Sequence, residues 1–116
     1  AAGPAELVTP HVRPQESGSR RGVRTAVIRT TEGAVRVSVV GGEALDAGVA
    51  LTVSPWDRTT LSTTSHASLL PAPTATHVSL DIAQSGVGTA TCGPGVLPRH
   101  RLPARDASFA LLFETV

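Results

Sequence analysis

The fold is decided by the stretch Val-Arg-Val-Ser-Val at residues 35–39. Valine occupies every second position, and arginine and serine stand between the valines. Because successive side chains of a β-strand point to opposite faces of a sheet, this period of two predicts a strand with one buried face. Gly41 and Gly42 follow and are expected to break the strand. The stretch therefore predicts a half-buried strand that contributes to the core of a sheet protein.

Outward from this stretch, four further segments alternate in the same way and predict strands at residues 23–28, 49–53, 78–82 and 109–113. A shorter strand is predicted at residues 100–102, between two prolines. One marginal helix is predicted at residues 58–66, where Asp57 can accept hydrogen bonds from backbone N–H groups as the N-cap. Many short strands with glycine and proline turns predict an all-β chain folded as an antiparallel β-sandwich.

Length and composition set the scale of the domain. The chain has 116 residues, which suits one domain with one core. Residues 1–19 hold three prolines and predict an extended lead-in, so the sandwich domain is expected at residues 20–116. The net charge of +1 gives no indication of binding to nucleic acid or to an anionic membrane.

The expected cellular compartment follows from what the sequence lacks. No apolar run approaches the roughly 20 residues that a membrane-spanning helix needs, and the first residues do not follow the signal-peptide pattern. Cys92 is the single cysteine, so no internal disulfide can form, and we expect a reducing, cytoplasmic location. The chain contains no methionine, which we interpret as the mark of a fragment or trimmed product.

Acidic residues provide little sign of catalysis. Hydrolysis by two carboxylates needs them about 5 to 9 Å apart. Only Glu16, Asp57 and Asp81 stand in settings of interest, and no spacing pairs them. We interpret Asp81 as a surface or hydrogen-bonding residue on the polar face of a strand, and Glu16 as an ion-pair partner of the arginines near it in sequence. No catalytic residue is therefore predicted.

Metal, thiol and phosphate chemistry receive no better support. The four histidines and the cysteine show neither His-x-x-x-His nor Cys-x-x-Cys spacing, so no metal site is predicted. Cys92 is interpreted as a buried, inert thiol. The run Gly-Val-Gly at residues 86–88 superficially suggests a phosphate-binding loop, but Pro94 and Pro98 prevent the helix that such a loop requires. These glycines instead predict a wide loop.

Two runs in the sequence resemble a known family. Residues 13–20 read Arg-Pro-Gln-Glu-Ser-Gly-Ser-Arg, and residues 80–88 read Leu-Asp-Ile-Ala-Gln-Ser-Gly-Val-Gly. They resemble the runs Arg-Pro-Gln-Glu-Asn-Gly-Asn-Arg and Leu-Asp-x-x-Gln-x-Gly-Val-Gly near the end of the large β-galactosidases of glycoside hydrolase family 2. Between them, Ser-Pro-Trp at residues 54–56 is also similar, and the matches are collinear over residues 10–112.

The resemblance implies a place in a larger enzyme. Family members carry their catalytic glutamates in a TIM barrel, which is absent here, and end in a galactose-mutarotase-like supersandwich whose last half this chain resembles. A loop of that domain reaches the sugar site, which assigns Gly86, Gly88 and Cys92 to a substrate loop. Cys92 stands where the family has a tryptophan platform for the sugar, and a thiol cannot replace that apolar area.

The resemblance also implies partners and cofactors. The parent is expected to be a retaining β-galactosidase that hydrolyses terminal β-D-galactosides, with this chain as a non-catalytic, structural domain. Its partners are the remaining domains of the parent, the galactoside in the parent's site and further copies in a homo-oligomer, with no nucleic acid and no membrane. No cofactor is expected in this chain, because the family binds magnesium and sodium elsewhere.

Two alternatives stay open beside this interpretation. The chain is a stand-alone carbohydrate-binding module if its aromatic residues are arranged for stacking, but Phe109 and Phe113 fit core positions at period two, and Trp56 is expected to pack inside. Otherwise it is an assembly module. Half of a supersandwich is expected to expose apolar surface and open strand edges, and so to self-associate, unless it closes over its own core.

Overall fold

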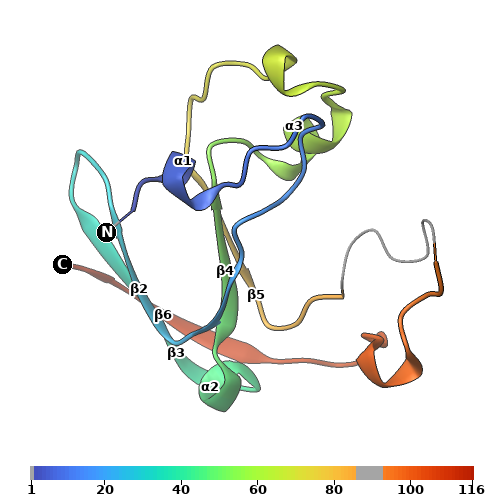
Figure 1. The fold of residues 1–116 in the computed structure, drawn as a ribbon. Coiled ribbons are helices and arrows are strands. Elements are labelled where there is room, and N and C mark those ends of the chain that lie inside the picture. Colours follow the sequence, from blue (N-terminus) through green and yellow to red (C-terminus); the bar gives the residue numbers. More distant parts are fainter. Residues whose placement is uncertain (1, 86–92) are drawn as a thin grey trace. The chain divides into compact units, whose positions relative to one another are not determined.

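The computed structural model describes residues 2–85 and 93–116, and strands make up most of its regular structure (Figure 1). The chain divides into two compact units. One unit comprises Ala1–Arg21 and Leu51–Leu80, and the other comprises Gly22–Ala50 and Asp81–Val116. Within the described ranges, no helix combines the length and the apolar character needed to cross a bilayer.

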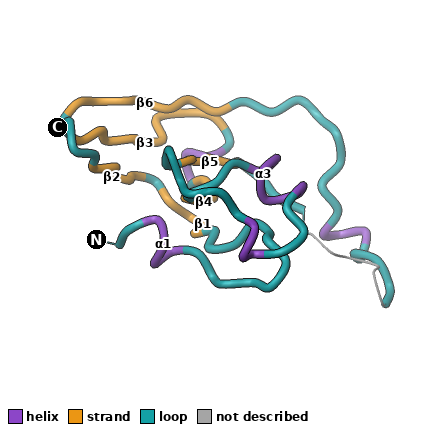
Figure 2. Tube along the Cα trace, turned by 90° about the horizontal axis from the view of Figure 1, so that it is seen from above, coloured by secondary structure: helices purple, strands orange, loops and turns teal. Residues whose placement is uncertain are grey.

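An antiparallel sheet of three strands dominates the second unit. It contains β2 (Thr25–Arg29), β3 (Ala34–Gly42) and β6 (Phe109–Thr115), in the order β2-β3-β6. β3 pairs with both neighbours, and the three strands run side by side in Figure 2. The valine alternation therefore correctly predicts a strand. At the two glycines the strand does not stop at once: the β3–β6 register shifts between Val39 and Gly41, and β3 continues to Gly42.

The register of this sheet separates an apolar face from a polar face. Val37 is directly opposite Ala26 on one side and Phe113 on the other. Arg36 is opposite Glu114, with an ion pair of 3.8 Å between them. Because side chains alternate with a period of two, one face of the sheet is apolar. We call it the apolar face; it consists of Ala26, Ile28, Val35, Val37, Val39, Leu111 and Phe113.

Burial along the apolar face is uneven. Val37 is buried, with 5% of its surface exposed, but Phe113 is 61% exposed and Phe109 is 43% exposed. The prediction that both phenylalanines lie in the core is therefore wrong. β6 is an edge strand with a neighbour on one side only, so its side chains have fewer residues to pack against. A period of two identifies the face of a residue but not whether another element covers it.

A second three-stranded sheet has the order β1-β4-β5, from β1 (Arg20–Val23), β4 (Val49–Ser54) and β5 (His77–Asp81). The central strand β4 is the best buried, and it ends directly before Pro55 as predicted. The strands predicted at residues 49–53 and 78–82 are confirmed to within one residue at each end. With two sheets and only short helices, the predicted all-β sandwich class is confirmed.

The helical segments are short. α3 (Arg58–Thr63) is the predicted helix, but it ends three residues early because Thr64 is extended. The Thr63 hydroxyl bonds to the Thr59 carbonyl and the Thr64 hydroxyl to the Thr60 carbonyl, competition with the backbone that is typical of threonine. The remaining helical segments in the described part are α1 (Pro4–Leu7), α2 (Ala44–Ala47) and two 3-10 turns, Ala67–Leu69 and Pro98–His100.

Two strand predictions need correction. The strand predicted at residues 100–102 is absent, and the chain there follows the 3-10 turn, because proline at its first position is preorganised for a helical turn. The strand predicted at residues 23–28 is divided at Arg24 into the end of β1 and the start of β2. The Arg24 guanidinium donates to the backbone carbonyl of Asp46, which ties this break to the turn ahead of β4.

An ion pair holds the chain just ahead of β6. Both terminal nitrogens of Arg105 donate to the Glu43 carboxylate, at 2.9 and 2.6 Å, and the Glu43 N–H donates to the Ser108 carbonyl at 3.0 Å. The hydrogen bond from Arg105 is the main cause that lowers the pKa of Glu43, and the pKa of Arg105 is raised in turn. We call these contacts the Glu43 clamp. The clamp joins the chain after β3 to the approach of β6, 62 residues later.

A close backbone approach accompanies the start of β4. Gly48 has φ of +72°, and a Cβ atom there would lie 2.5 Å from the carbonyl carbon of Gly22. No side chain fits at that distance, and the left-handed conformation alone disfavours other residues. The link between α2 and β4 therefore requires glycine.

We expect Gly48→Ala to lower the free energy of unfolding by more than about 2 kcal/mol, because it combines backbone strain with a steric clash. Urea unfolding followed by Trp56 fluorescence measures this. Gly93→Ala is the control: a Cβ there meets nothing within 4 Å, and we expect a change of about 0.5 kcal/mol or less. Equal stability of the two variants would contradict the packing described here.

Candidate functional site

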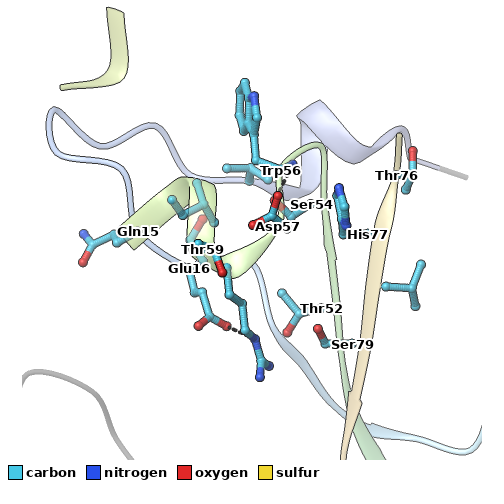
Figure 3. Close-up of a pocket in the computed structure, with 15 residues that line it drawn as sticks. Gln15, Glu16, Thr52, Ser54, Trp56, Asp57, Thr59, Thr76, His77 and Ser79 are labelled. Atoms are coloured by element: carbon cyan, nitrogen blue, oxygen red, sulfur yellow. Dashed lines mark hydrogen bonds and ion pairs between the residues drawn. The ribbon is translucent and has the colours of Figure 1, made fainter. Parts of the chain in front are cut away.

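A cavity of about 530 Å³ lies in the first unit (Figure 3). This volume is within the range of small-molecule sites, roughly 300 to 1,000 Å³. Its walls come from three parts of the unit: the N-terminal segment around Glu16, the start of α3, and one face of strands β4 and β5. The cavity therefore brings together residues that are far apart in the sequence.

Polar side chains cover the sheet face that borders the cavity. Thr52 and Ser54 alternate on β4, and His77 and Ser79 alternate on the neighbouring β5. In Figure 3 these four side chains extend to the same side of the two strands, the side on which Asp57 lies. We call these four residues the polar floor. Thr52 is the most enclosed of them, with 7% of its surface exposed.

An ion pair lines another wall. The Arg58 Nε atom lies 3.0 Å from a Glu16 carboxylate oxygen, and both side chains are about half exposed. The prediction that Glu16 forms an ion pair is confirmed, but the partner is not one of the arginines at residues 13, 20 and 24 near it in sequence. Residues 42 positions apart meet because the N-terminal segment and α3 belong to one unit, which sequence proximity does not reveal.

Asp57 is the N-cap of α3, as the sequence predicts. One carboxylate oxygen accepts from the Thr60 N–H and the other from the Thr60 hydroxyl, each at 2.8 Å. These two hydrogen bonds, the backbone one first, hold the pKa of Asp57 below its usual value, and the nearby His77 contributes to a smaller extent. The carboxylate is therefore charged at neutral pH and already engaged with α3.

The three acidic residues singled out from the sequence all have partners. Glu16 pairs with Arg58, Asp57 binds Thr60, and Asp81 accepts a hydrogen bond of 2.8 Å from the Gln84 amide. The local hydrogen-bonding role predicted for Asp81 is thus confirmed. A general acid needs a raised pKa, and the pKa of Asp57 is shifted the other way. The hydrogen bonds therefore hold the Asp57 carboxylate as the cap of α3.

Trp56 lies at the edge of this cavity and is half-buried, which only partly meets the expectation that it packs inside. Its indole Nε1 donates to the Pro71 carbonyl at 2.8 Å, and its backbone N–H donates to the Ser54 hydroxyl at 3.1 Å. In Figure 3 the ring points away from Thr52 and Ser79. These two hydrogen bonds fix the orientation of the indole.

The predicted substrate loop is not part of this cavity. Gly86, Gly88 and Cys92 lie outside the described residues. Conversely, the polar floor is not among the residues predicted from the sequence, because alternation within a strand does not show what lies opposite its polar face. The signal that was available is the pair of alternations in β4 and β5, which place hydroxyl and imidazole groups on one shared face.

Comparisons with known proteins agree on one relationship. The family model described as "Beta galactosidase small chain" matches residues 2–113. A protein named β-galactosidase from Staphylococcus xylosus is 30% identical over 100 residues, which cover 86% of this chain and 10% of that relative. The chain thus spans about a tenth of the length of this curated relative.

Asp57→Asn removes the negative charge of the N-cap but keeps a side chain that can accept the capping hydrogen bond, because asparagine is also a good N-cap. The lowered pKa of Asp57 means that its contribution to stability is present above its unfolded-state pKa and is lost as pH falls through the folded-state value. We therefore expect the wild-type chain to lose stability more steeply than Asp57→Asn below about pH 4.

Urea unfolding at a series of pH values between about 6 and 2 measures this difference. Glu114→Gln is a control that removes an exposed carboxylate from the other unit and should leave the acid slope nearly unchanged. Parallel acid slopes for wild type and Asp57→Asn would contradict the role given to the Asp57 charge.

Proposed function

Because the chain belongs to the β-galactosidase small-chain family, we propose that it is a non-catalytic β-sandwich domain of a β-galactosidase. The observation that carries the proposal is the extent of the family match, which includes nearly every residue of the chain. In this proposal the parent enzyme hydrolyses terminal β-D-galactosides, and the catalytic carboxylates lie elsewhere in it. Residues 20–116 form the domain proper, and residues 1–19 lead into it.

The state of the acidic residues supports a non-catalytic role. Retaining glycosidases need one carboxylate as nucleophile and a second as acid–base, about 5 to 5.5 Å apart. In the described structure, Glu16, Asp57 and Asp81 are each engaged by a side chain or backbone group. These contacts support the proposal that the chain is a structural component of the enzyme.

The apolar face of the β2-β3-β6 sheet supports a role in assembly. Val35 and Phe113 are exposed on it, although their register with buried Val37 places them on the core side of the sheet. Exposed apolar surface beside an open strand edge is typical of an interface. We propose that the remaining part of the β-galactosidase covers this face, as the other half of a supersandwich would.

The loop containing Gly86, Gly88 and Cys92 has a separate part in the proposal. By resemblance to the family it faces the galactose site of the complete enzyme, where Cys92 replaces the tryptophan platform. The parent is further proposed to bind magnesium and sodium outside this chain and to act as a homo-oligomer in the cytoplasm.

Activity measurements test the non-catalytic role. We expect the 116-residue chain alone to leave o-nitrophenyl β-D-galactoside intact, because the proposal places the two catalytic carboxylates in another part of the enzyme. We expect the β-galactosidase lacking this chain to regain hydrolysis when the chain is supplied in trans. Turnover by the chain alone, or activity of the remaining enzyme that is independent of the chain, would overturn the proposal.

The apolar face is tested by comparing two neighbouring residues of β6. Phe113→Asp places a charge on the apolar face, while Leu112→Asp places one on the opposite face of the same strand. Both side chains are substantially exposed, so both variants should fold. We expect Phe113→Asp to weaken binding to the rest of the enzyme at least 10-fold, and Leu112→Asp to weaken it much less. Co-purification and analytical ultracentrifugation measure this, and equal effects would exclude the apolar face as the interface.

A further inference from the structure

We propose that the cavity of the first unit binds a small, uncharged, polyhydroxylated molecule such as a monosaccharide or cyclic polyol. The site consists of the polar floor, the Glu16–Arg58 pair and the rim at Trp56. None of these residues belongs to the substrate loop of the proposed function. The inference therefore stands independently of that function.

The polar floor has unused hydrogen-bonding capacity. Thr52, His77 and Ser79 form no side-chain hydrogen bond with another residue in the part of the chain that the structure describes. Thr52 alone of the three is buried, and leaving its hydroxyl without a partner there costs free energy, whereas Ser79 is half-buried and His77 is exposed. A floor of hydroxyl and imidazole groups fits a guest that supplies donors and acceptors.

The Thr52 hydroxyl is accessible to a molecule in the cavity. No fully buried side-chain oxygen or nitrogen in the described residues lacks a hydrogen-bond partner. Thr52 is 7% exposed and has no side-chain partner there, so its hydroxyl must be accessible from the cavity. Ser79 lies on the neighbouring strand β5 and lines the same cavity, so one guest can contact both side chains.

The charges in the walls of the cavity are balanced, which favours an uncharged guest. The Glu16 carboxylate and the Arg58 guanidinium compensate each other, and both oxygens of Asp57 are engaged by Thr60. Neither an anion nor a cation therefore finds an uncompensated counter-charge. Serine and threonine hydroxyls both donate and accept, which matches the hydroxyl groups of a polyol.

The size of the cavity agrees with this ligand class. About 530 Å³ accommodates a single sugar ring, within the range of small-molecule sites. Trp56 lines the cavity while its ring points away from Thr52 and Ser79, so the polar floor and not the indole face provides the contacts for such a ligand. Trp56 is the only tryptophan of the chain and lines the cavity, so the fluorescence signal comes from one residue of this unit.

Titration of the 116-residue chain with D-galactose, D-glucose and myo-inositol tests the proposal. We expect at least one of them to change Trp56 fluorescence saturably and to shift the amide NMR signals of Thr52 and Ser79. Inorganic phosphate and acetate should produce neither effect at equal ionic strength. Absence of a saturable response to all three polyols in both measurements would overturn the proposal, as would stronger binding of an anion.

Substitutions locate the site. Thr52→Val and Ser79→Ala remove one hydroxyl each, and we expect each to weaken polyol binding about 10-fold, the usual value of one hydrogen bond. Thr31→Val, which removes an exposed hydroxyl in the other unit, is the control and should bind as wild type does. Circular dichroism and urea unfolding identify any variant that fails to fold. Binding that survives in a folded Thr52→Val, Ser79→Ala double variant would exclude the cavity as the site.

Discussion

The structure depends on strand β3 being hydrogen-bonded on both sides. Its register with β2 and β6 aligns Ala26, Val37 and Phe113 in one row, and this row fixes which face of the sheet is apolar. A slip of one residue would turn the whole valine set to the polar face and Arg36 to the apolar face. The two neighbours of β3 are 84 residues apart in sequence at their starts, so this pairing defines the unit as a whole.

Sequence patterns predicted the strands well wherever the alternation of apolar and polar residues alone determines the position of a strand. Val35, Val37 and Val39 marked β3 correctly, and Asp57 marked the start of α3 through its capping hydrogen bonds. The patterns did not predict features that depend on distant partners. Nothing local to Glu16 indicates Arg58 as its partner, and nothing local to Phe113 indicates that β6 is an edge strand.

The candidate site also depends on residues that are distant in the sequence. The alternation of β4 and β5 is visible in the sequence, but alternation does not show what lies opposite the polar side of these strands. The structure places Thr52 and Ser79 at the floor of a cavity, because an N-terminal segment and α3 lie in the same unit as that face of the sheet. The family resemblance directed attention to Gly86, Gly88 and Cys92, which are outside the described residues. Period and composition thus identify a face, and only tertiary structure identifies what lies opposite it.

The Glu43 clamp has a consequence for how this chain can diverge. Arg105 and Ser108 are anchored to Glu43, so the start of β6 is positioned independently of the 23 residues between Asp81 and Arg105. The entropy of closing a loop grows only slowly with its length, so insertions in that connection should disturb the sheet little. Substitutions and insertions in this connection should therefore have little effect on folding, so selection for stability there is weak. Two fixed ends make it a suitable place for a protein family to acquire new specificities.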